Sequence, residues 1–262
     1  MTNKRESEGR QMERFRLRRI DEPDFGCEGR PDGKPIMDKV YLRSAQGAEQ
    51  VVEVADALLY ERDLNEGDMV LWDGEQELVK APDKVAVFFP GIGYHCDKPL
   101  LYYTKQLARK KGYEILEVPY GNFPVGVKEN AEKMMQAFFS ALEQAEEILK
   151  EVCWENYTQI LFVSKSIGTA VAGAYAQQHA LETRNIFFTP VEQTFQCISQ
   201  EGIVFHGTSD PWAETEQVEK ECDAMNLPLY KVVGANHSLE TEDAIENIHN
   251  LGRVMDIVNR YI

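Results

Sequence analysis

Beyond Pro82 the sequence alternates short apolar runs with longer amphipathic segments in a regular order. The first run, residues 85–89, is apolar throughout, as expected of a strand buried on both faces of a sheet. Strands that alternate with helices predict βαβ units, and therefore an α/β fold with a mostly parallel sheet flanked by helices. The further strands are predicted at 114–118, 160–163, 186–188, 202–205 and 229–233, and the helices at 99–111, 127–152, 168–181 and 240–261.

The sequence before Ala81 has a different pattern, which predicts a small β-rich unit. Apolar and basic residues alternate over 15–20, and a stretch rich in glycine and proline follows at 22–35. The turn residues Ala45-Gln46-Gly47 and Asp73-Gly74 each lie between two short apolar runs, which predicts two hairpins. The last hairpin either belongs to a separate small barrel or extends the larger sheet as antiparallel edge strands. Nothing in this unit indicates chemistry.

These patterns divide the chain into a polar tail (1–13), the β-rich unit (14–80) and an α/β domain (82–262). The tail is highly charged and has no apolar segment, so it is not a signal peptide. No apolar run is long enough to cross a bilayer. A net charge of −16 repels phosphate backbones, so we expect neither a nucleic-acid nor a membrane partner.

The five cysteines are scattered and form no C-x-x-C pair, which indicates reduced thiols in a cytoplasmic protein. The adjacent residues His95, Cys96 and Asp97 lack the spacing of a zinc site. We therefore expect no metal and no cofactor. A homo-oligomer is compatible with the sequence.

Polar side chains follow three of the predicted strands, and ligand sites of parallel α/β sheets form at the carboxyl ends of the strands. Ser166 lies in Ser164-Lys165-Ser166-Ile167-Gly168, directly before a helix. Asp210 follows the next-to-last strand and His237 follows the last one. Each also has a simpler interpretation: Ser166 and Asp210 as helix caps, and His237 as a residue beside the caps Ser238 or Thr241.

With this order of serine, aspartate and histidine on strand-to-helix loops, residues 82–262 resemble the α/β-hydrolase superfamily, in particular compact, lid-less serine esterases. The resemblance implies that Ser166 is a nucleophile, His237 its general base and Asp210 the group that orients the histidine. It implies an oxyanion hole made by the N–H of Ile167 and a second N–H from the loop 90–97, either Ile92 or Gly93. The superfamily pattern G-x-S-x-G has Ser164 in place of its first glycine.

The resemblance also allows expectations about the pocket. Only residues 189–201 separate two consecutive strands where larger members carry a lid, so we expect an open pocket for small or short acyl groups. The expected lining residues are Tyr94, His95, Phe123, Phe195 and Trp212. Adjacent side chains leave a sharp turn in different directions, so Lys165 is expected to be exposed. His206, at a strand end, is expected to be a packed, hydrogen-bonded core histidine.

Three functions are compatible with this pattern. The first is a serine hydrolase that cleaves carboxylic esters or thioesters through an acyl-enzyme. The second is an acyltransferase of the same fold, in which an alcohol, amine or thiol intercepts the acyl-enzyme. The third is a non-catalytic hydrolase-fold protein that uses its β-rich unit for binding, because a fold does not fix a function.

Overall fold

The computed structural model describes residues 12–24, 33, 35–75, 77–123, 126–127, 130–198 and 201–262. The contacts that residues make with one another in space divide the chain into two compact units, Met1–Pro82 and Asp83–Ile262. Most of the expected polar tail and most of the turn-rich stretch 22–35, including Cys27, lie outside the described residues. None of the described helices is both long and apolar enough to cross a membrane.

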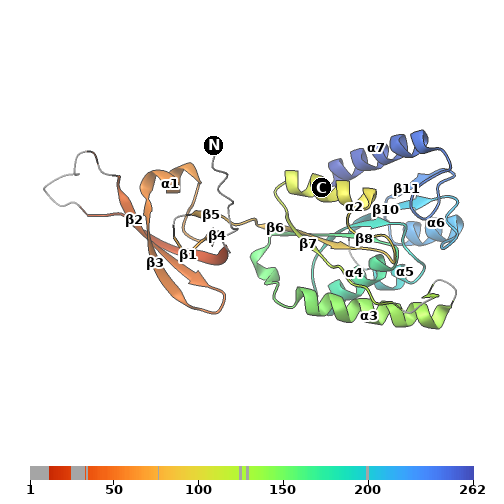
Figure 1. The fold of residues 1–262 in the computed structure, drawn as a ribbon, viewed down its shortest axis with the longest axis horizontal. Helices are drawn as coiled ribbons and strands as arrows, with labels where there is room; N and C mark the ends of the chain where they lie inside the picture. The colour runs from red at the N-terminus through yellow and green to blue at the C-terminus, as the bar shows by residue number, and fades with distance from the viewer. Residues whose placement is uncertain are drawn as a thin grey trace, which may run out of the picture. The chain divides into compact units, whose positions relative to one another are not determined.

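The first unit is a five-stranded antiparallel sheet with the strand order β3-β2-β1-β4-β5 and one short helix (Figure 1). Alternate residues of β1 are buried, which places Phe15 and Leu17 in the core of the unit with Val40, Leu42 and Val70. The elements are β1 (Glu13–Asp21), β2 (Met37–Ser44), β3 (Glu49–Ala55), α1 (Asp56–Glu61), β4 (Met69–Trp72) and β5 (Leu78–Lys80).

Both predicted hairpins are present, because β2 pairs with β3 and β4 pairs with β5. Gly47 has a φ of 85° and Gly74 a φ of 85°, a conformation that favours glycine at such turns. The last hairpin belongs to the sheet of the first unit and does not extend the second sheet. Helix α1 was not predicted.

The second unit contains a six-stranded sheet in which all neighbouring strands are parallel. The strand order is β11-β10-β9-β8-β6-β7. The predicted parallel sheet is therefore confirmed. Its strands are β6 (Lys84–Phe89), β7 (Glu114–Glu117), β8 (Gln159–Lys165), β9 (Arg184–Phe188), β10 (Gly202–Gly207) and β11 (Leu229–Val232).

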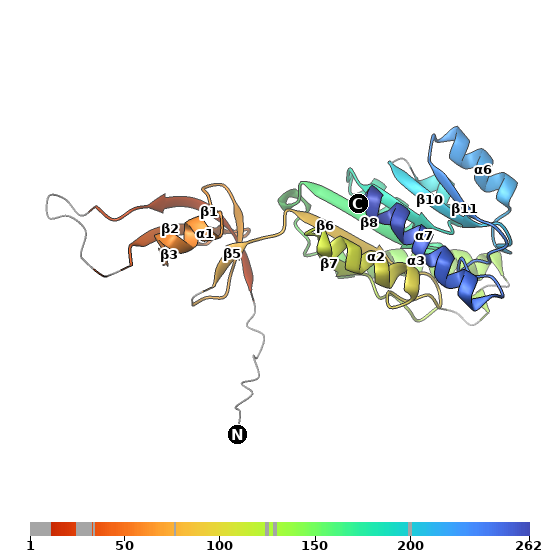
Figure 2. The ribbon, with the colours of Figure 1, turned by 90° about the horizontal axis from the view of Figure 1, so that it is seen from above.

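Helices cover both faces of this sheet (Figures 1 and 2). Helices α2 (Pro99–Lys110) and α7 (Ala244–Tyr261) pack on one face, against Phe88, Val163 and Phe205. The opposite face, with Val87, Phe162 and Phe187, carries the other helices. These are α3 (Ala131–Leu149), α4 (Ile167–Gln178), α5 (Thr194–Cys197) and α6 (Thr215–Ala224).

Two helices begin later than predicted because a capping side chain sets their first residue. The Asn130 side chain accepts hydrogen bonds from the N–H groups of Glu132 and Lys133, so α3 begins at Ala131 rather than near 127. The Asp243 side chain caps α7 in the same way, so this helix begins at Ala244 rather than near 240.

The strand order changes direction between β6 and β8: β7 pairs with one side of β6, and all later strands lie on the other side. In open α/β sheets such a switch point leaves a crevice at the carboxyl ends of the two strands. Here β6 leads into the loop that begins at Pro90, and β8 leads into Ser166. The topology therefore places these two loops side by side.

Candidate active site

Ser166 lies at a sharp turn between β8 and α4. Its backbone has a φ of 55° and a ψ of −127°, a conformation that non-glycine residues rarely adopt. The Ser166 N–H donates to the carbonyl of Phe188 at 3.1 Å, which fastens the turn to β9. Ser166 occupies the N-cap position of α4, but its side chain makes no cap hydrogen bond, so the hydroxyl does not act as a helix cap.

Small residues allow this turn to pack against the end of β6. A Cβ on Gly168 would lie 2.3 Å from the carbonyl oxygen of Phe89 and 2.5 Å from that of Pro90. Ser164, which replaces the first glycine of the G-x-S-x-G pattern, is fully buried and donates its hydroxyl to the carbonyl of Ile186 at 3.3 Å. The structure therefore accommodates this substitution with a hydrogen bond to β9.

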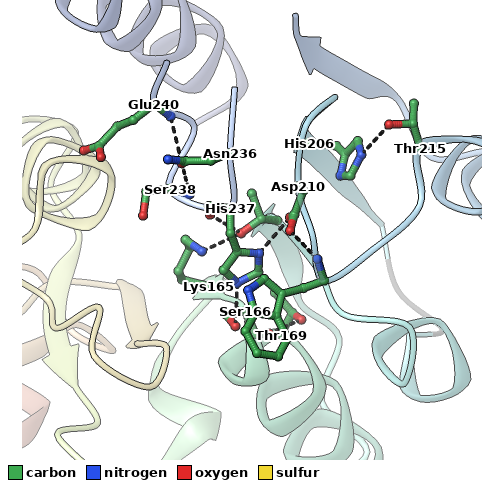
Figure 3. Close-up of polar contacts among 12 residues, drawn as sticks. Lys165, Ser166, Thr169, His206, Asp210, Thr215, Asn236, His237, Ser238 and Glu240 are labelled. Atoms are coloured by element: carbon green, nitrogen blue, oxygen red, sulfur yellow. Dashed lines mark hydrogen bonds and ion pairs between the residues drawn. The ribbon is translucent and has the colours of Figure 1, made fainter. Parts of the chain in front are cut away.

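Asp210 and His237 come from the loops after β10 and β11 and meet Ser166 (Figure 3). His237 Nε2 lies 2.8 Å from Ser166 Oγ, and His237 Nδ1 lies 2.7 Å from Asp210 Oδ2. The other carboxylate oxygen, Asp210 Oδ1, accepts the N–H of Trp212 at 2.8 Å. The buried carboxylate thereby fixes the histidine ring with Nδ1 as the donor, and leaves Nε2 to accept the proton of Ser166.

Asp210 does not cap a helix, and neither Ser238 nor Thr241 is the cap of the helix that follows His237. Helix α6 begins at Thr215, after Glu214, and α7 is capped by Asp243. The His237 loop instead packs on the end of β10, where a Cβ on Gly207 would lie 2.4 Å from the carbonyl oxygen of Ala235. This close approach brings the loops of Asp210 and His237 together.

The loop after β6 forms a tight turn beside Ser166. Gly91 and Tyr94 exchange two backbone hydrogen bonds of 3.1 Å, and Gly93 between them has a φ of 77°. The hydroxyl of Tyr120 donates to the carbonyl of Pro90 at 2.5 Å, which anchors the start of the turn. Ile92 and Gly93 line the same cavity as Ser166 and Ile167.

That cavity has a volume of about 320 Å³, and two of the five predicted lining residues border it. Tyr94 is buried in its wall, where the Tyr94 hydroxyl accepts the N–H of Leu100 and burial raises the pKa of Tyr94 to about 12. Trp212 lies beside the base, with its ring centroid 6.2 Å from that of His237.

The other three lining predictions are wrong. The His95 side chain is 65% exposed and lies near Asp97, outside the cavity wall. The ring centroid of Phe123 lies 6.0 Å from that of Tyr120, and Phe123 packs in apolar clusters, one of which includes Ile167, without bordering the cavity. Phe195 turns away into the core under α6, with Phe187 and Val204.

No family model matches the chain, and no curated protein matches its sequence. Solved structures do resemble it. A lid-less α/β serine hydrolase from Xanthomonas campestris has a TM-score of 0.53 at 12% identity, over 89% of this chain and 98% of its own. The chain has the α/β-hydrolase fold.

Two further structures carry the same conclusion. An α/β serine hydrolase homologue from Coxiella burnetii has a TM-score of 0.50 at 13% identity, over 74% of this chain and 92% of its own. Est1E from Butyrivibrio proteoclasticus, with bound ferulic acid, has a TM-score of 0.50 at 12% identity, over 68% of this chain and 87% of its own. At these identities the likeness concerns the hydrolase fold alone.

Sequence reasoning missed part of the cavity wall of this hydrolase fold. Met134 of α3 and Val191 after β9 border the cavity of Ser166. A second cavity of about 490 Å³ adjoins the first and shares with it Met134, Ile167, Val191 and Trp212. Met134 lies on the apolar face predicted for this helix, but the pattern could not indicate which apolar residues face a cavity and which face the core.

The expectation that Lys165 is exposed is wrong. Lys165 is only 1% exposed, and its ammonium lies 2.5 Å from Thr189 Oγ1 and 5.1 Å from the ring centroid of Tyr94. Lys165 is the last residue of β8, and its side chain enters the protein where that of Ser166 turns outward (Figure 3).

His206 is buried, as predicted, and its Nε2 lies 2.9 Å from Thr215 Oγ1. Burial lowers the pKa of His206, which favours the neutral ring. Among the described residues its Nδ1 has no hydrogen-bond partner. The described part of the chain holds no group of three metal-ligating side chains.

Proposed function

We propose that this protein is a serine hydrolase that cleaves carboxylic esters or thioesters through an acyl-enzyme. The observation that carries the proposal is the continuous hydrogen-bonded row of Ser166, His237 and Asp210 on a nucleophile-elbow turn. A serine hydroxyl is a weak nucleophile unless a base removes its proton as it attacks, and this row supplies such a base.

In the proposed reaction, Ser166 Oγ attacks the substrate carbonyl while His237 Nε2 takes its proton. The N–H groups of Ile167 and Ile92 stabilise the oxyanion of the tetrahedral intermediate. The intermediate collapses when His237 gives its proton to the departing alcohol or thiol, which leaves the acyl group on Ser166. Water then attacks the acyl-enzyme, with His237 as base and then acid, and releases the carboxylic acid. Asp210 keeps the imidazole in the required tautomer and stabilises its protonated form.

The two adjoining cavities support a substrate with an apolar acyl group. We assign short acyl groups to the first cavity, which Met134 and Trp212 border. Longer chains extend over Ile167 and Val191 into the second, whose wall also contains Ala170 and Phe138. The substrate range proposed here therefore includes longer chains than the sequence alone suggested.

The first test is intact-mass spectrometry after incubation with a fluorophosphonate probe. Wild type should gain a single adduct, whereas Ser166→Ala and His237→Ala should gain none. Ser140→Ala is the matched control, because Ser140 lies in α3 and its hydroxyl accepts only a side-chain amide hydrogen bond from Gln144 among the contacts described. The absence of an adduct on folded wild type would contradict the proposal.

A panel of p-nitrophenyl esters from acetate to decanoate tests the acyl site. Ala170 borders the second cavity but not the first. Ala170→Leu should therefore lower kcat/KM for the longer esters and leave kcat/KM for the acetate unaffected. Equal losses across the panel would contradict the assignment of the second cavity. Product analysis with added alcohol, amine or thiol acceptors separates hydrolysis from acyl transfer.

A further inference from the structure

Thr189, directly after β9, has an unusual backbone conformation. Its φ is 43°, although a β-branched side chain makes positive φ values a genuine outlier. Thr189 is fully buried, and its N–H donates to the carbonyl of Phe205 at 2.7 Å. Such strain persists only where the surrounding structure imposes it, and it is found at functional sites more often than elsewhere.

The Thr189 side chain connects two loops of the proposed active site. Its Oγ1 lies 2.5 Å from Lys165 Nζ and donates to the backbone carbonyl of His237 at 3.0 Å. A lysine ammonium has donors only, so Oγ1 must accept from Lys165. The single hydroxyl proton of Thr189 is then directed to His237.

Almost none of the Lys165 surface is available to a substrate. Lys165 borders the cavity of Ser166, but only 1% of its surface is exposed. A buried ammonium needs hydrogen bonds and favourable electrostatics to offset its lost hydration. Thr189 Oγ1 and the face of the Tyr94 ring, 5.1 Å away, contribute to both.

We propose that Lys165 and Thr189 are positioning residues that hold the backbone of His237 in register with Ser166. The connection begins at the residue that precedes the nucleophile and ends at the carbonyl of the base itself. It joins the two loops whose side chains must stay within hydrogen-bond distance for proton transfer. The inference rests on the function proposed above.

The test compares Thr189→Val, which removes the hydroxyl and keeps the β-branched shape, with Thr189→Ser, which keeps the hydroxyl. Because small misplacements of catalytic groups cost up to about 100-fold, we expect Thr189→Val to lower kcat for p-nitrophenyl butyrate about 10- to 100-fold, with KM nearly unchanged. Thr189→Ser should restore the rate to within about threefold of wild type.

Thr104→Val is the matched control. Thr104 is also fully buried, and its hydroxyl donates to the carbonyl of Leu100 at 2.7 Å within α2. Its substitution removes the same kind of hydrogen bond, but not one that reaches the His237 loop. Thr104→Val should therefore retain the wild-type kcat. Equal losses in Thr104→Val and Thr189→Val would overturn the proposal.

Lys165→Met completes a double-mutant cycle. If Lys165 acts through Thr189, the double variant should lose no more activity than Thr189→Val alone, whereas independent roles give losses that multiply. Losses that multiply would overturn the proposal that Lys165 acts through Thr189.

A measurement that does not require turnover separates this inference from the proposed function. The proton that His237 Nδ1 donates to Asp210 gives a downfield NMR resonance, which should shift or broaden in Thr189→Val and be retained in Thr189→Ser and Thr104→Val. An unreactive wild type with this response would contradict the proposed function and support the inference. A reactive wild type whose resonance is the same in Thr189→Val would overturn the inference alone.

Discussion

The two units of this protein bury different kinds of side chain. Among the described residues of Met1–Pro82, Asp38 alone is a buried polar or charged side chain, and the rest of the core is apolar. In Asp83–Ile262 the buried polar and charged set is larger. Lys165, Thr189, His206 and Asp210 lie at or shortly after the carboxyl ends of strands, and others, such as Thr104 and Asn250, lie within helices. Burying a polar group costs free energy unless it is hydrogen-bonded. Four of the buried polar groups of the second unit thus lie at the edge of the sheet that carries the proposed site, whereas the described part of the first unit buries a single carboxylate.

The largest expected effect is on the carboxylate at the end of the hydrogen-bonded row. Asp210→Asn preserves the shape of the side chain but no longer fixes the tautomer of His237, so kcat should fall about 10³- to 10⁴-fold with little change in Tm. Steady-state kinetics with p-nitrophenyl butyrate measures the loss. Asp38→Asn makes the same change to a buried carboxylate of the first unit and should leave kcat unchanged. A loss below tenfold in Asp210→Asn would remove the distinction between the two units.

The second-largest expected effect is on the stability of the first unit. Leu17 is fully buried in its core, so Leu17→Ala should destabilise that unit by about 2–5 kcal/mol. The residues of the proposed site all lie in the second unit, and fluorophosphonate labelling of Ser166 should proceed at the wild-type rate. Denaturant unfolding monitored together with labelling measures both properties. A parallel loss of labelling would show that the chemistry depends on the first unit.

A smaller effect separates two glycines of the second unit. An added Cβ at Gly168 meets the backbone of Phe89 and Pro90, so Gly168→Ala should cost about 1–3 kcal/mol and slow labelling of Ser166. An added Cβ at Gly252, within α7, meets no atom within 4 Å. Gly252→Ala should instead stabilise the protein by about 0.5–1 kcal/mol. Thermal unfolding of the two variants measures the difference, and equal effects would mean that the elbow tolerates a side chain.

The features that the sequence predicts well are periodic or ordered along the chain. Continuous apolar runs such as 85–89 correspond to strands buried on both faces. Ser166, Asp210 and His237 follow β8, β10 and β11, and these strands have the same order across the sheet as along the chain. In a parallel sheet, a residue just after a strand must lie at the carboxyl edge. The placement of these three residues at one edge of the sheet therefore follows from topology alone.

Side-chain direction at a turn does not follow from such patterns. Lys165 was expected to be exposed because adjacent side chains leave a sharp turn in different directions. The two directions do differ at this turn, but Ser166 is the residue that faces the cavity, and Lys165 is buried. Phe195 was expected in the pocket because of its loop, but the four-residue helix α5 turns it into the core. These outcomes depend on single backbone torsions and on the rotation of short helices, which no periodic pattern records.

The smallest expected effect concerns pH. All five histidines of the chain follow residue 82, so histidine titration affects the second unit alone. Burial lowers the pKa of His206 below its ordinary value of 6.5, although Asp210 and Glu219 oppose that shift while His237 and Lys231 add to it. The unfolded chain then binds this proton more readily than the folded one, so the contribution of neutral His206 to stability is present above pH 6.5 and declines as the pH falls through that value.

His206→Gln removes the titration and keeps a polar group near Thr215. The free energy of unfolding of the second unit should therefore fall less steeply between pH 7.5 and pH 5.5 in this variant than in wild type, while that of the first unit should be the same in both proteins. A variant as acid-sensitive as wild type would show that His206 is not a source of the pH dependence.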